Sequence, residues 1–284
     1  MSDPLVVATR ADLDRALDRL RTPGARLALV PTMGALHDGH RALMRRAHEV
    51  ADVVVVSIFV NPLQFGSADD LARYPRTWDP DLAVCRAESV TVVWAPSVAE
   101  MYPHDVPTVS VSAGGLGEQL EGASRPGHFD GMLTVVAKLF GQVRPDAAVF
   151  GAKDAQQLFL VRRMSGDLDL RVAVEPVETV RADDGLALSS RNGRLSDEGR
   201  RAATALPRAL AAGASVPATG PTAVRAAALT VLDAEPGVML DYLALVDPDT
   251  FAEVDDTHAG PTLVLVAGLV EGTRLIDNAM VSCG

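Results

Sequence analysis

Two histidines lie three residues apart in the segment Pro31-Thr32-Met33-Gly34-Ala35-Leu36-His37-Asp38-Gly39-His40. An apolar run of strand type precedes this segment and a helical pattern follows it, which predicts a strand-to-helix loop. In an open α/β sheet such loops bind ligands, because the N–H groups at the start of a helix attract anions. His37 and His40 could stabilise charge on a departing pyrophosphate there. The segment therefore predicts a nucleotide phosphate site, and it fits neither the P-loop nor the dinucleotide pattern.

Two other interpretations of the histidine pair stay open. The imidazoles of His37 and His40 could simply satisfy the start of the helix. Alternatively, neighbouring histidines on a helix can bind zinc, although no third ligand follows at the usual local spacing.

Two more segments carry groups that suit phosphate. Lys153 lies in the segment from Phe150 to Gln157, where a strand end again meets a helix, and Asp154 is a plausible cap of that helix. The loop from Asp183 to Asn192 presents Ser189, Ser190 and Arg191 in succession, and hydroxyl and guanidinium groups are phosphate donors. Taken alone, the lysine could be a solvated surface residue and the loop an ordinary helix entry. These segments gain a function only if they share one site.

Two glutamines could bind a small hydroxy acid. Gln64 follows the apolar run Val53–Val60, so it lies at the same edge of the predicted sheet as the histidines. Gln157 lies one helical turn after Lys153, and its amide offers both a donor and an acceptor. Either residue could equally belong to a surface turn.

These segments are positioned by an alternation of β-branched runs and helical patterns, which is typical of a parallel sheet with helices on both faces. We expect a Rossmann-like α/β domain at residues 1–179 and a smaller α+β domain at residues 180–284. The expected strands of the first domain are Arg26–Pro31, Val53–Val60, Thr91–Ala95, Thr108–Val111 and Ala147–Phe150, and its helices are Asp38–Ala51, Asp130–Val143 and Asp154–Met164.

The second domain should contain an Ala- and Arg-rich helical stretch and then a linker or surface loop at Ala211–Pro221, which is rich in Ala, Gly and Pro. Three strands should follow, at Met239–Val246, Thr262–Leu269 and Thr273–Asn278. The last two strands are joined by Val270, Glu271 and Gly272, which predicts a hairpin.

The composition narrows the class of protein. A formal net charge of −11 and a pI near 5.0 argue against a nucleic-acid-binding protein, because such binding needs a basic face. Cys85 and Cys283 are the two cysteines, far apart and without metal-like spacing, which favours a reducing compartment. The start of the chain lacks a signal-peptide pattern, and the most apolar run is too short to span a bilayer. We therefore expect a cytoplasmic enzyme that binds neither membrane nor nucleic acid.

Six spaced motifs together resemble the pantothenate synthetase family of the nucleotidyltransferase-like superfamily. They are Pro-Thr-Met-Gly-x-Leu-His-x-Gly-His, Phe-Val-Asn-Pro-x-Gln-Phe, Arg-Pro-Gly-His-Phe-x-Gly, Phe-Gly-x-Lys-Asp-x-Gln-Gln, Gly-Leu-Ala-Leu-Ser-Ser-Arg-Asn and Leu-Ile-Asp-Asn-x-Met-Val. They occur in family order through most of the chain. The resemblance implies that ATP and pantoate form pantoyl adenylate and diphosphate, and that β-alanine then displaces AMP to give pantothenate.

The resemblance also implies the roles of individual residues. His40 would act in the acid role, with His37, Lys153, Ser189, Ser190 and Arg191 stabilising the leaving pyrophosphate. ATP would lie along Met33, Gly34, Ala35, Leu36, His37, Asp38, Gly39 and His40, along Gly151, Ala152, Lys153 and Asp154, and against Val180, Leu188, Ser189, Ser190 and Arg191. Pantoate and β-alanine would contact Gln64, Gln157, Pro31, Thr32 and Met33. The smaller domain would act as a lid, and the enzyme would be a homodimer.

Two positions depart from the family pattern. Asp81 matches an acidic residue of the family and is the candidate Mg²⁺ ligand, but the residue before it, which is often acidic in the family and associated with the metal, is Pro80 here. Magnesium would then be held mainly by the triphosphate and water. Ala152 stands where the family commonly has Glu, which could alter loop packing or substrate entry.

Other functions compete with this interpretation. A different nucleotidyltransferase of the same superfamily would carry a similar ATP motif. A nucleotide-binding regulatory module without turnover, or a metal hydrolase built on His37 and His40, would belong to other classes.

Overall fold

The computed structural model describes residues 3–216 and 220–284, which divide into two compact units. The first unit contains residues up to Ala152 together with Gln156–Glu178. The second contains Thr179–Gly284 and also the short segment Lys153–Ala155. Within the described ranges, no helix is both long and apolar enough to cross a membrane.

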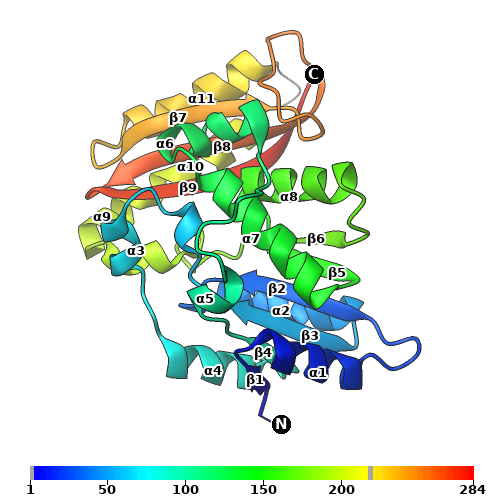
Figure 1. Ribbon diagram of the computed structural model, residues 1–284. Helices are drawn as coiled ribbons and strands as arrows, with labels where there is room; N and C mark the ends of the chain where they lie inside the picture. Colours follow the sequence, from blue (N-terminus) through cyan, green and yellow to red (C-terminus); the bar gives the residue numbers. More distant parts are fainter. Residues whose placement is uncertain (1–2, 217–219) are drawn as a thin grey trace. The chain divides into compact units, whose positions relative to one another are not determined.

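The first unit is built on a six-stranded sheet in the order β1-β4-β3-β2-β5-β6, with every neighbouring pair parallel. Figure 1 shows this sheet beneath the labels β1 to β6. Its strands are β1 (Leu5–Val7), β2 (Leu27–Thr32), β3 (Val53–Ile58), β4 (Val92–Trp94), β5 (Ala147–Gly151) and β6 (Ala173–Val177). The expected α/β fold with a parallel sheet is confirmed.

Alternate residues of the central strands face two separate apolar cores, which is why these strands read as continuous apolar runs. Leu29 and Val55 pack in one core with residues of α1 (Arg10–Leu20), α7 (His128–Val143) and α8 (Ala155–Asp167). Val30 and Val56 pack in the other core with residues of α2 (Asp38–Val50) and α4 (Trp78–Ala87). Helices therefore cover both faces and leave the strand ends for ligands. Short elements fill the connections: η1 (Pro62–Gln64), α3 (Ala68–Arg73), α5 (Val98–Met101), η2 (Gly114–Glu118) and α6 (Glu121–Ser124).

The second unit has a three-stranded antiparallel sheet in the order β7-β8-β9. Its strands are β7 (Met239–Val246), β8 (Gly260–Val270) and β9 (Thr273–Cys283), and its helices are η3 (Ser190–Arg194), α9 (Asp197–Ala203), α10 (Ala205–Ala214) and α11 (Pro221–Asp233). Apolar residues of α10 and α11 pack with the inward side chains of the sheet, such as Leu245 and Val266. The predicted hairpin is confirmed, because Val270 pairs with Thr273 around a turn in which Glu271 and Gly272 have positive φ.

Four details of the secondary structure differ from expectation. Thr108–Val111 is not a strand: the Val111 N–H binds the Thr134 hydroxyl of α7 instead of a sheet neighbour, and Val109 is 85% exposed. The range expected for the loop, Ala211–Pro221, is too wide, since α10 continues to Ala214 and α11 begins at Pro221. Residues 217–219 of this range lie outside the described residues. Strands β1 and β6 were missed, because β1 is three residues long and β6 contains Pro176 and is only partly buried.

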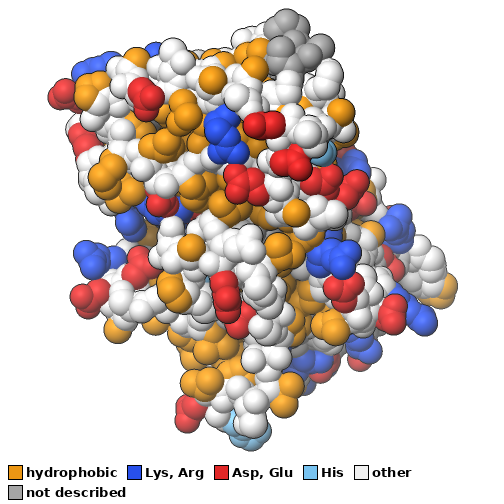
Figure 2. Space-filling model, turned by 90° about the horizontal axis from the view of Figure 1, so that it is seen from above, with side chains coloured by type: hydrophobic (Ala, Val, Ile, Leu, Met, Phe, Trp, Pro, Cys, Tyr) orange, Lys and Arg blue, Asp and Glu red, His pale blue; other side chains and the backbone are white. Residues whose placement is uncertain are grey.

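Arginines on the surface are often neutralised by neighbouring carboxylates. Arg41 and Arg45 share Glu88, at 2.9 and 2.8 Å, and Arg46 binds Glu175 at 2.8 Å. On the face shown in Figure 2, Lys and Arg side chains lie in small groups among acidic and apolar ones. Guanidinium groups paired in this way have part of their charge already neutralised.

Gly131 lets α7 approach the turn η1 more closely than any other residue would allow. A Cβ atom at this position would lie 2.2 Å from the Leu63 carbonyl oxygen and 2.4 Å from its carbon. The Gly131 carbonyl in turn accepts the Asn61 side-chain amide at 3.0 Å. This contact between backbones places the end of η1, which carries Gln64.

We predict opposite effects for alanine at two glycines of α7. Gly131→Ala should lower the free energy of unfolding by about 1–3 kcal/mol, because the added methyl overpacks against backbone. Gly141→Ala should raise it by about 0.5–1 kcal/mol, because Gly141 is exposed, its Cβ would meet nothing within 4 Å, and alanine is the better helix former. Urea denaturation of both variants measures these values. Equal effects at the two positions would contradict the close approach.

Candidate active site

The histidine pair forms a capping box at the start of α2. The His37 Nδ1 atom accepts the Gly39 N–H at 3.1 Å, and the His37 N–H donates to the His40 Nδ1 atom at 3.2 Å. The two ring centroids are 4.2 Å apart, and both side chains are half-buried. The helix-capping interpretation of this pair is therefore correct for one nitrogen of each ring.

This capping also determines which tautomer the neutral form of each ring adopts. Because each Nδ1 atom accepts a backbone N–H, the proton of the neutral imidazole resides on Nε2. His37 and His40 thus present Nε2–H donors at a helix N-terminus, next to the carboxyl end of β2. Capping and anion binding use different atoms, so the two interpretations are compatible.

The loop that leads to the histidines is held by the carboxylate of Asp81 on α4. Its Oδ2 atom accepts the Ala35 N–H at 3.1 Å, and its Oδ1 atom accepts the Leu36 N–H at 2.8 Å. Gly34 and Ala35 both have positive φ, +80° and +52°, and a Cβ at Gly34 would lie 2.8 Å from the same carboxylate. Asp81 is 2% exposed. A buried anion therefore stabilises a left-handed turn that includes a strained alanine.

The donor set around Asp81 does not fit a protein-held magnesium ion. Both carboxylate oxygens already accept N–H groups, and the Thr77 hydroxyl donates to Oδ1 at 3.2 Å. The preceding Pro80 has no ligand atom in its side chain. Among the described residues, no group of three or more His, Cys, Asp or Glu side chains could hold a metal. This geometry does not favour the metal role expected for Asp81.

The Cys85 thiol, close to Asp81, is unreactive. Burial, and next the negative charge of Asp81, raise the pKa of the Cys85 thiol to about 12. The thiol stays protonated at neutral pH, where a thiolate would be the reactive form. Cys283 is buried as well.

Gln64 belongs to a buried polar network at the neighbouring strand end. The Asn61 amide donates to the Gln64 Oε1 atom at 3.1 Å, and the Tyr102 hydroxyl donates to the Asn61 Oδ1 atom at 2.7 Å. The Gln64 amide donates to the Met33 sulfur at 3.1 Å, so the β2 loop and the turn η1 meet at this glutamine. A sulfur atom is a weak acceptor, and a polar ligand could replace it without a large cost.

The backbone of Gln64 is held from the other side by the Arg-Pro-Gly-His motif. The His128 Nδ1 atom lies 2.8 Å from the Gln64 carbonyl oxygen, and Arg125 donates to the same oxygen at 3.4 Å. Sequence reasoning assigned no role to Asn61, Tyr102, Arg125 or His128. The motif that contains Arg125 and His128 was the available signal, but only the folded chain shows what it contacts.

Gln156 and Gln157, at the start of α8, differ in what their side chains contact. Gln156 is buried, and its side chain satisfies backbone groups of Glu121, Leu116 and Gln119 at 2.7–3.1 Å. Gln157 is half-buried, and no described residue forms a hydrogen bond with its side chain. Of the pair, Gln157 therefore has the amide that remains available to a substrate. Gly151 ends β5, and the Ala152 N–H donates to the Val177 carbonyl at 2.8 Å.

In the second unit, the expected phosphate loop begins with a small hairpin. The Leu188 N–H donates to Val180 at 2.9 Å, and the Ala182 N–H donates to Leu186 at 2.9 Å around the left-handed Gly185. The 3-10 helix η3 follows directly, and the Ser189 hydroxyl accepts the Arg191 N–H at 3.2 Å as its cap. Leu188 to Arg191 therefore lie between a closed hairpin and a capped helical turn, which fixes their backbone.

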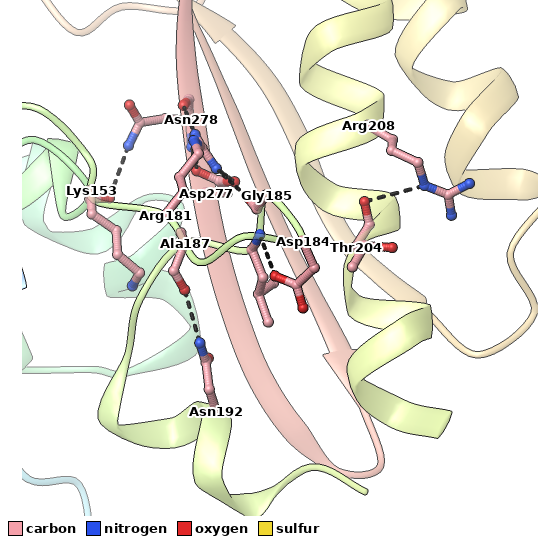
Figure 3. A network of polar contacts seen from close by, with 11 residues as sticks. Lys153, Arg181, Asp184, Gly185, Ala187, Asn192, Thr204, Arg208, Asp277 and Asn278 are labelled. Carbon is pink, nitrogen blue, oxygen red and sulfur yellow. Dashed lines mark hydrogen bonds and ion pairs between the residues drawn. The ribbon is translucent and has the colours of Figure 1, made fainter. Parts of the chain in front are cut away.

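A hollow in this unit is lined by Lys153, Ser189, Arg191, Asn192 and Arg274, among others. No described residue forms a hydrogen bond or an ion pair with the Lys153 ammonium, the Arg191 guanidinium or the Ser190 hydroxyl. Figure 3 shows Lys153 close to the hairpin and to β9. These groups are the unpaired donors that an anionic ligand needs.

Asn192 adds a buried acceptor to the lining of this hollow. Its Nδ2 atom donates to the Ala187 carbonyl at 3.0 Å, which fixes the orientation of the amide (Figure 3). Its Oδ1 atom is buried and has no partner among the described residues. A buried polar atom without a partner is rare in a folded protein, and a donor from a ligand or from water would satisfy it.

The structure brings the predicted residues together within each unit. Pro31–His40, Gln64 and Gln157 belong to the first unit, where Met33 contacts Gln64 and His37 contacts His40. Lys153, Asp154, Val180 and Leu188–Arg191 belong to the second, where Lys153, Ser189 and Arg191 line one hollow. Asp154 directly precedes α8, as a capping residue would, and is exposed.

We predict that Asp81→Asn lowers the free energy of unfolding by about 1–3 kcal/mol, because the amide cannot accept both the Ala35 and Leu36 N–H groups and leaves a buried donor unsatisfied. Asp79→Asn is the matched control, since Asp79 is exposed in the same first turn of α4 and should change stability by less than about 0.5 kcal/mol. Urea denaturation measures both. Equal stabilities for the two variants would show that the carboxylate does not hold the loop.

Comparisons with known proteins identify the family. A family model described as pantoate-beta-alanine ligase matches residues 5–280. The pantothenate synthetase of Leifsonia xyli subsp. xyli is 56% identical over 260 residues, which cover 92% of this chain and 90% of that protein. That of Acidothermus cellulolyticus is 56% identical over 280 residues, which cover 97% and 91%.

Solved structures agree with the sequence relatives. The pantothenate synthetase of Thermus thermophilus superposes with a TM-score of 0.89 at 46% identity, and the match covers 97% of this chain and 98% of that one. The pantoate-beta-alanine ligase of Francisella tularensis, solved with beta-gamma ATP and β-alanine, gives 0.80 at 29% identity and covers 98% and 97%. The resemblance seen in the six motifs is confirmed, and the chain belongs to the pantoate–β-alanine ligase family, the family of the pantothenate synthetases.

Proposed function

We propose that this chain condenses (R)-pantoate with β-alanine at the expense of ATP, giving pantothenate, AMP and diphosphate. The observation that carries the proposal is the family match over residues 5–280, which includes every segment assigned to the site. The histidine pair at the start of α2, together with Lys153 and Arg191, whose charged groups have no partner among the described residues, supplies donors that this reaction needs.

The assignment of residues to substrates is part of this proposal. ATP contacts Met33–His40, Gly151–Asp154, Val180 and Leu188–Arg191. Pantoate binds to Gln64 and Gln157, next to Pro31, Thr32 and Met33, and β-alanine arrives at Gln64. Residues 1–179 then form the domain that binds pantoate and ATP, and residues 180–284 form the smaller domain that contributes the Ser-Ser-Arg loop. The compact units of the structure are compatible with this division.

In the first half-reaction, a pantoate carboxylate oxygen attacks the α-phosphorus of ATP, and the bond to the bridging oxygen of diphosphate breaks. Negative charge accumulates on the leaving diphosphate, so preorganised donors lower the barrier. The Nε2–H groups of His37 and His40 serve this purpose, as do the Lys153 ammonium, the hydroxyls of Ser189 and Ser190, and the Arg191 guanidinium. His40 can also supply a proton to the departing oxygen.

In the second half-reaction, the amine of β-alanine attacks the activated carbonyl of pantoyl adenylate. The C–N bond forms, the bond from the carbonyl carbon to the AMP oxygen breaks, and the amine loses a proton. The Gln64 side chain accepts the Asn61 amide and its backbone carbonyl contacts His128, which limits the orientations in which Gln64 presents pantoate to the incoming amine.

In this proposal ATP binds as its magnesium complex. The triphosphate and water would hold the ion, as is common for Mg²⁺. The Asp81 carboxylate is already engaged with the Ala35 and Leu36 N–H groups and with the Thr77 hydroxyl. We also propose a homodimer, because closed two-fold pairs dominate soluble oligomers, and a cytoplasmic location, because two buried thiols suit a reducing compartment.

The rival proposal is a nucleotidyltransferase that moves AMP onto a phosphorylated acceptor. Product analysis separates the two. With ATP and pantoate alone, the ligase should release diphosphate while the adenylate stays bound. Free AMP should accumulate in amounts that match the amide product only when β-alanine is added. Transfer of AMP to a phosphorylated acceptor would contradict the ligase.

We predict that His40→Ala and Lys153→Ala each lower kcat about 10²- to 10³-fold, equivalent to about 2.7–4 kcal/mol of barrier, because each removes a donor to developing charge. His104→Ala and Arg162→Ala are controls, since both side chains are exposed and lie outside the proposed site. Steady-state AMP production measures all four. Unchanged kcat in either His40→Ala or Lys153→Ala would contradict the role of that residue.

A further inference from the structure

Two neighbouring residues of β9 hold both phosphate-binding segments of the second unit. Asp277 and Asn278 come from the motif Leu-Ile-Asp-Asn, to which the proposed reaction assigns no part. Their side chains alternate along the strand, and Asp277 is buried while Asn278 is half-buried. Figure 3 shows both at the centre of a polar network.

The carboxylate of Asp277 binds Arg181 in a two-pronged contact. The Arg181 Nη1 and Nη2 atoms donate to Asp277 at 2.6 and 2.9 Å, and Nη1 also donates to the Gly185 carbonyl at 3.2 Å. The Asp277 side chain is 2% exposed and the Arg181 side chain 32%, so the carboxylate is buried while the guanidinium keeps contact with solvent. Because Arg181 lies at the base of the hairpin and Gly185 at its tip, one guanidinium ties the whole hairpin to β9.

Asn278 holds the other segment. Its Nδ2 atom donates to the backbone carbonyl of Lys153 at 2.9 Å. Lys153 precedes α8, and no described residue binds its ammonium, so its placement depends on its backbone. An anchored carbonyl restricts the directions that the long side chain can reach.

We infer that Asp277 and Asn278 are positioning residues that set the distance between Lys153 and the Ser189–Arg191 loop. This inference rests on the proposed role of those residues as donors to ATP phosphates. Successive residues of a strand have a fixed spacing, so a single rigid element serves as the reference for both segments. In this inference, Asn278 acts through the backbone of Lys153, and Asp277 acts through Arg181 and the hairpin.

Double-mutant cycles on the full chain distinguish positioning from general stabilisation. Asn278→Ala alone should lower kcat/KM for ATP about ten- to a hundred-fold, because a catalytic group displaced by about 1 Å loses that much. In a Lys153→Ala background, the same change should cost less than about threefold, since the group it positions is absent. Ser282→Ala, at an exposed site of the same strand, should leave both backgrounds unchanged.

Asp277 is tested in the same way against the loop. Asp277→Asn should lower kcat/KM for ATP about ten- to a hundred-fold in the wild-type background, and by a smaller factor in an Arg191→Ala background, where Ser189 and Ser190 are the loop donors that remain to be positioned. Thermal unfolding is recorded for every variant, so that a folded fraction is confirmed before rates are compared. Because Asn278→Ala keeps the buried ion pair, it tests the inference even where Asp277→Asn does not fold.

The possible outcomes distinguish a failure of the positioning role from a failure of the proposed function. Losses that shrink in the matched backgrounds support the inference. Losses of equal size in both backgrounds would show that Asp277 and Asn278 only stabilise the fold, and would overturn the inference while leaving the proposed function intact. Full activity of the single variant Lys153→Ala would refute the proposed donor role itself, and the inference with it.

Discussion

The carboxylate of Asp81 and the two backbone N–H groups that it accepts form the contact on which the first half of the site depends. Two successive left-handed residues, Gly34 and Ala35, turn the chain between β2 and α2, and such a turn is costly for alanine. A buried anion offsets this cost by accepting the N–H groups of Ala35 and Leu36. The turn then delivers His37 to the N-cap of α2, so that the orientation of both imidazoles follows from a residue on another helix.

Helix capping and the proposed catalytic role of the two histidine rings use different nitrogen atoms. Each Nδ1 atom is consumed by the backbone of the helix start, which keeps the rings close together and places the proton of the neutral form on Nε2. A catalytic donor gains most when its direction is set before the substrate arrives, because no reorganisation is then needed during the reaction. The same principle applies to Gln64, which is held by the side chains of Asn61, the N-cap of η1, and of His128 in α7.

In the second unit, strand β9 helps to hold the backbones of the candidate donor residues. Lys153, Ser190 and Arg191 have donors without described partners, while the backbones that carry them are tied to β9, to a hairpin and to a 3-10 turn. Rigid support with open donors is the arrangement expected of a site that binds a polyanion and then releases it. The acidic chain as a whole would repel such a ligand, and this makes a local concentration of unpaired cations necessary.

Much of the fold and the family was predictable from local patterns. The apolar runs indicated β2, β3, β4 and β5, and helical spacing indicated α2, α7 and α8, because side-chain periodicity is a local property of the chain. Thr108–Val111 was misassigned for the same reason: a tetrad with three β-branched residues looks like a strand, yet its Val111 N–H binds the Thr134 hydroxyl instead of a sheet neighbour. The edge strands β1 and β6 gave too weak a pattern, since they are short or only partly buried.

The amino-acid sequence by itself determined which residues are chemically competent and, through six spaced motifs, which family the chain belongs to. The tertiary structure alone decided what holds those residues in place. Asp81 lies 46 positions from Ala35, and Asn278 lies 125 positions from Lys153. Such partners meet only when the chain has folded, because a hydrogen bond depends on distance and angle in space, and neither can be read from the spacing of residues along the chain.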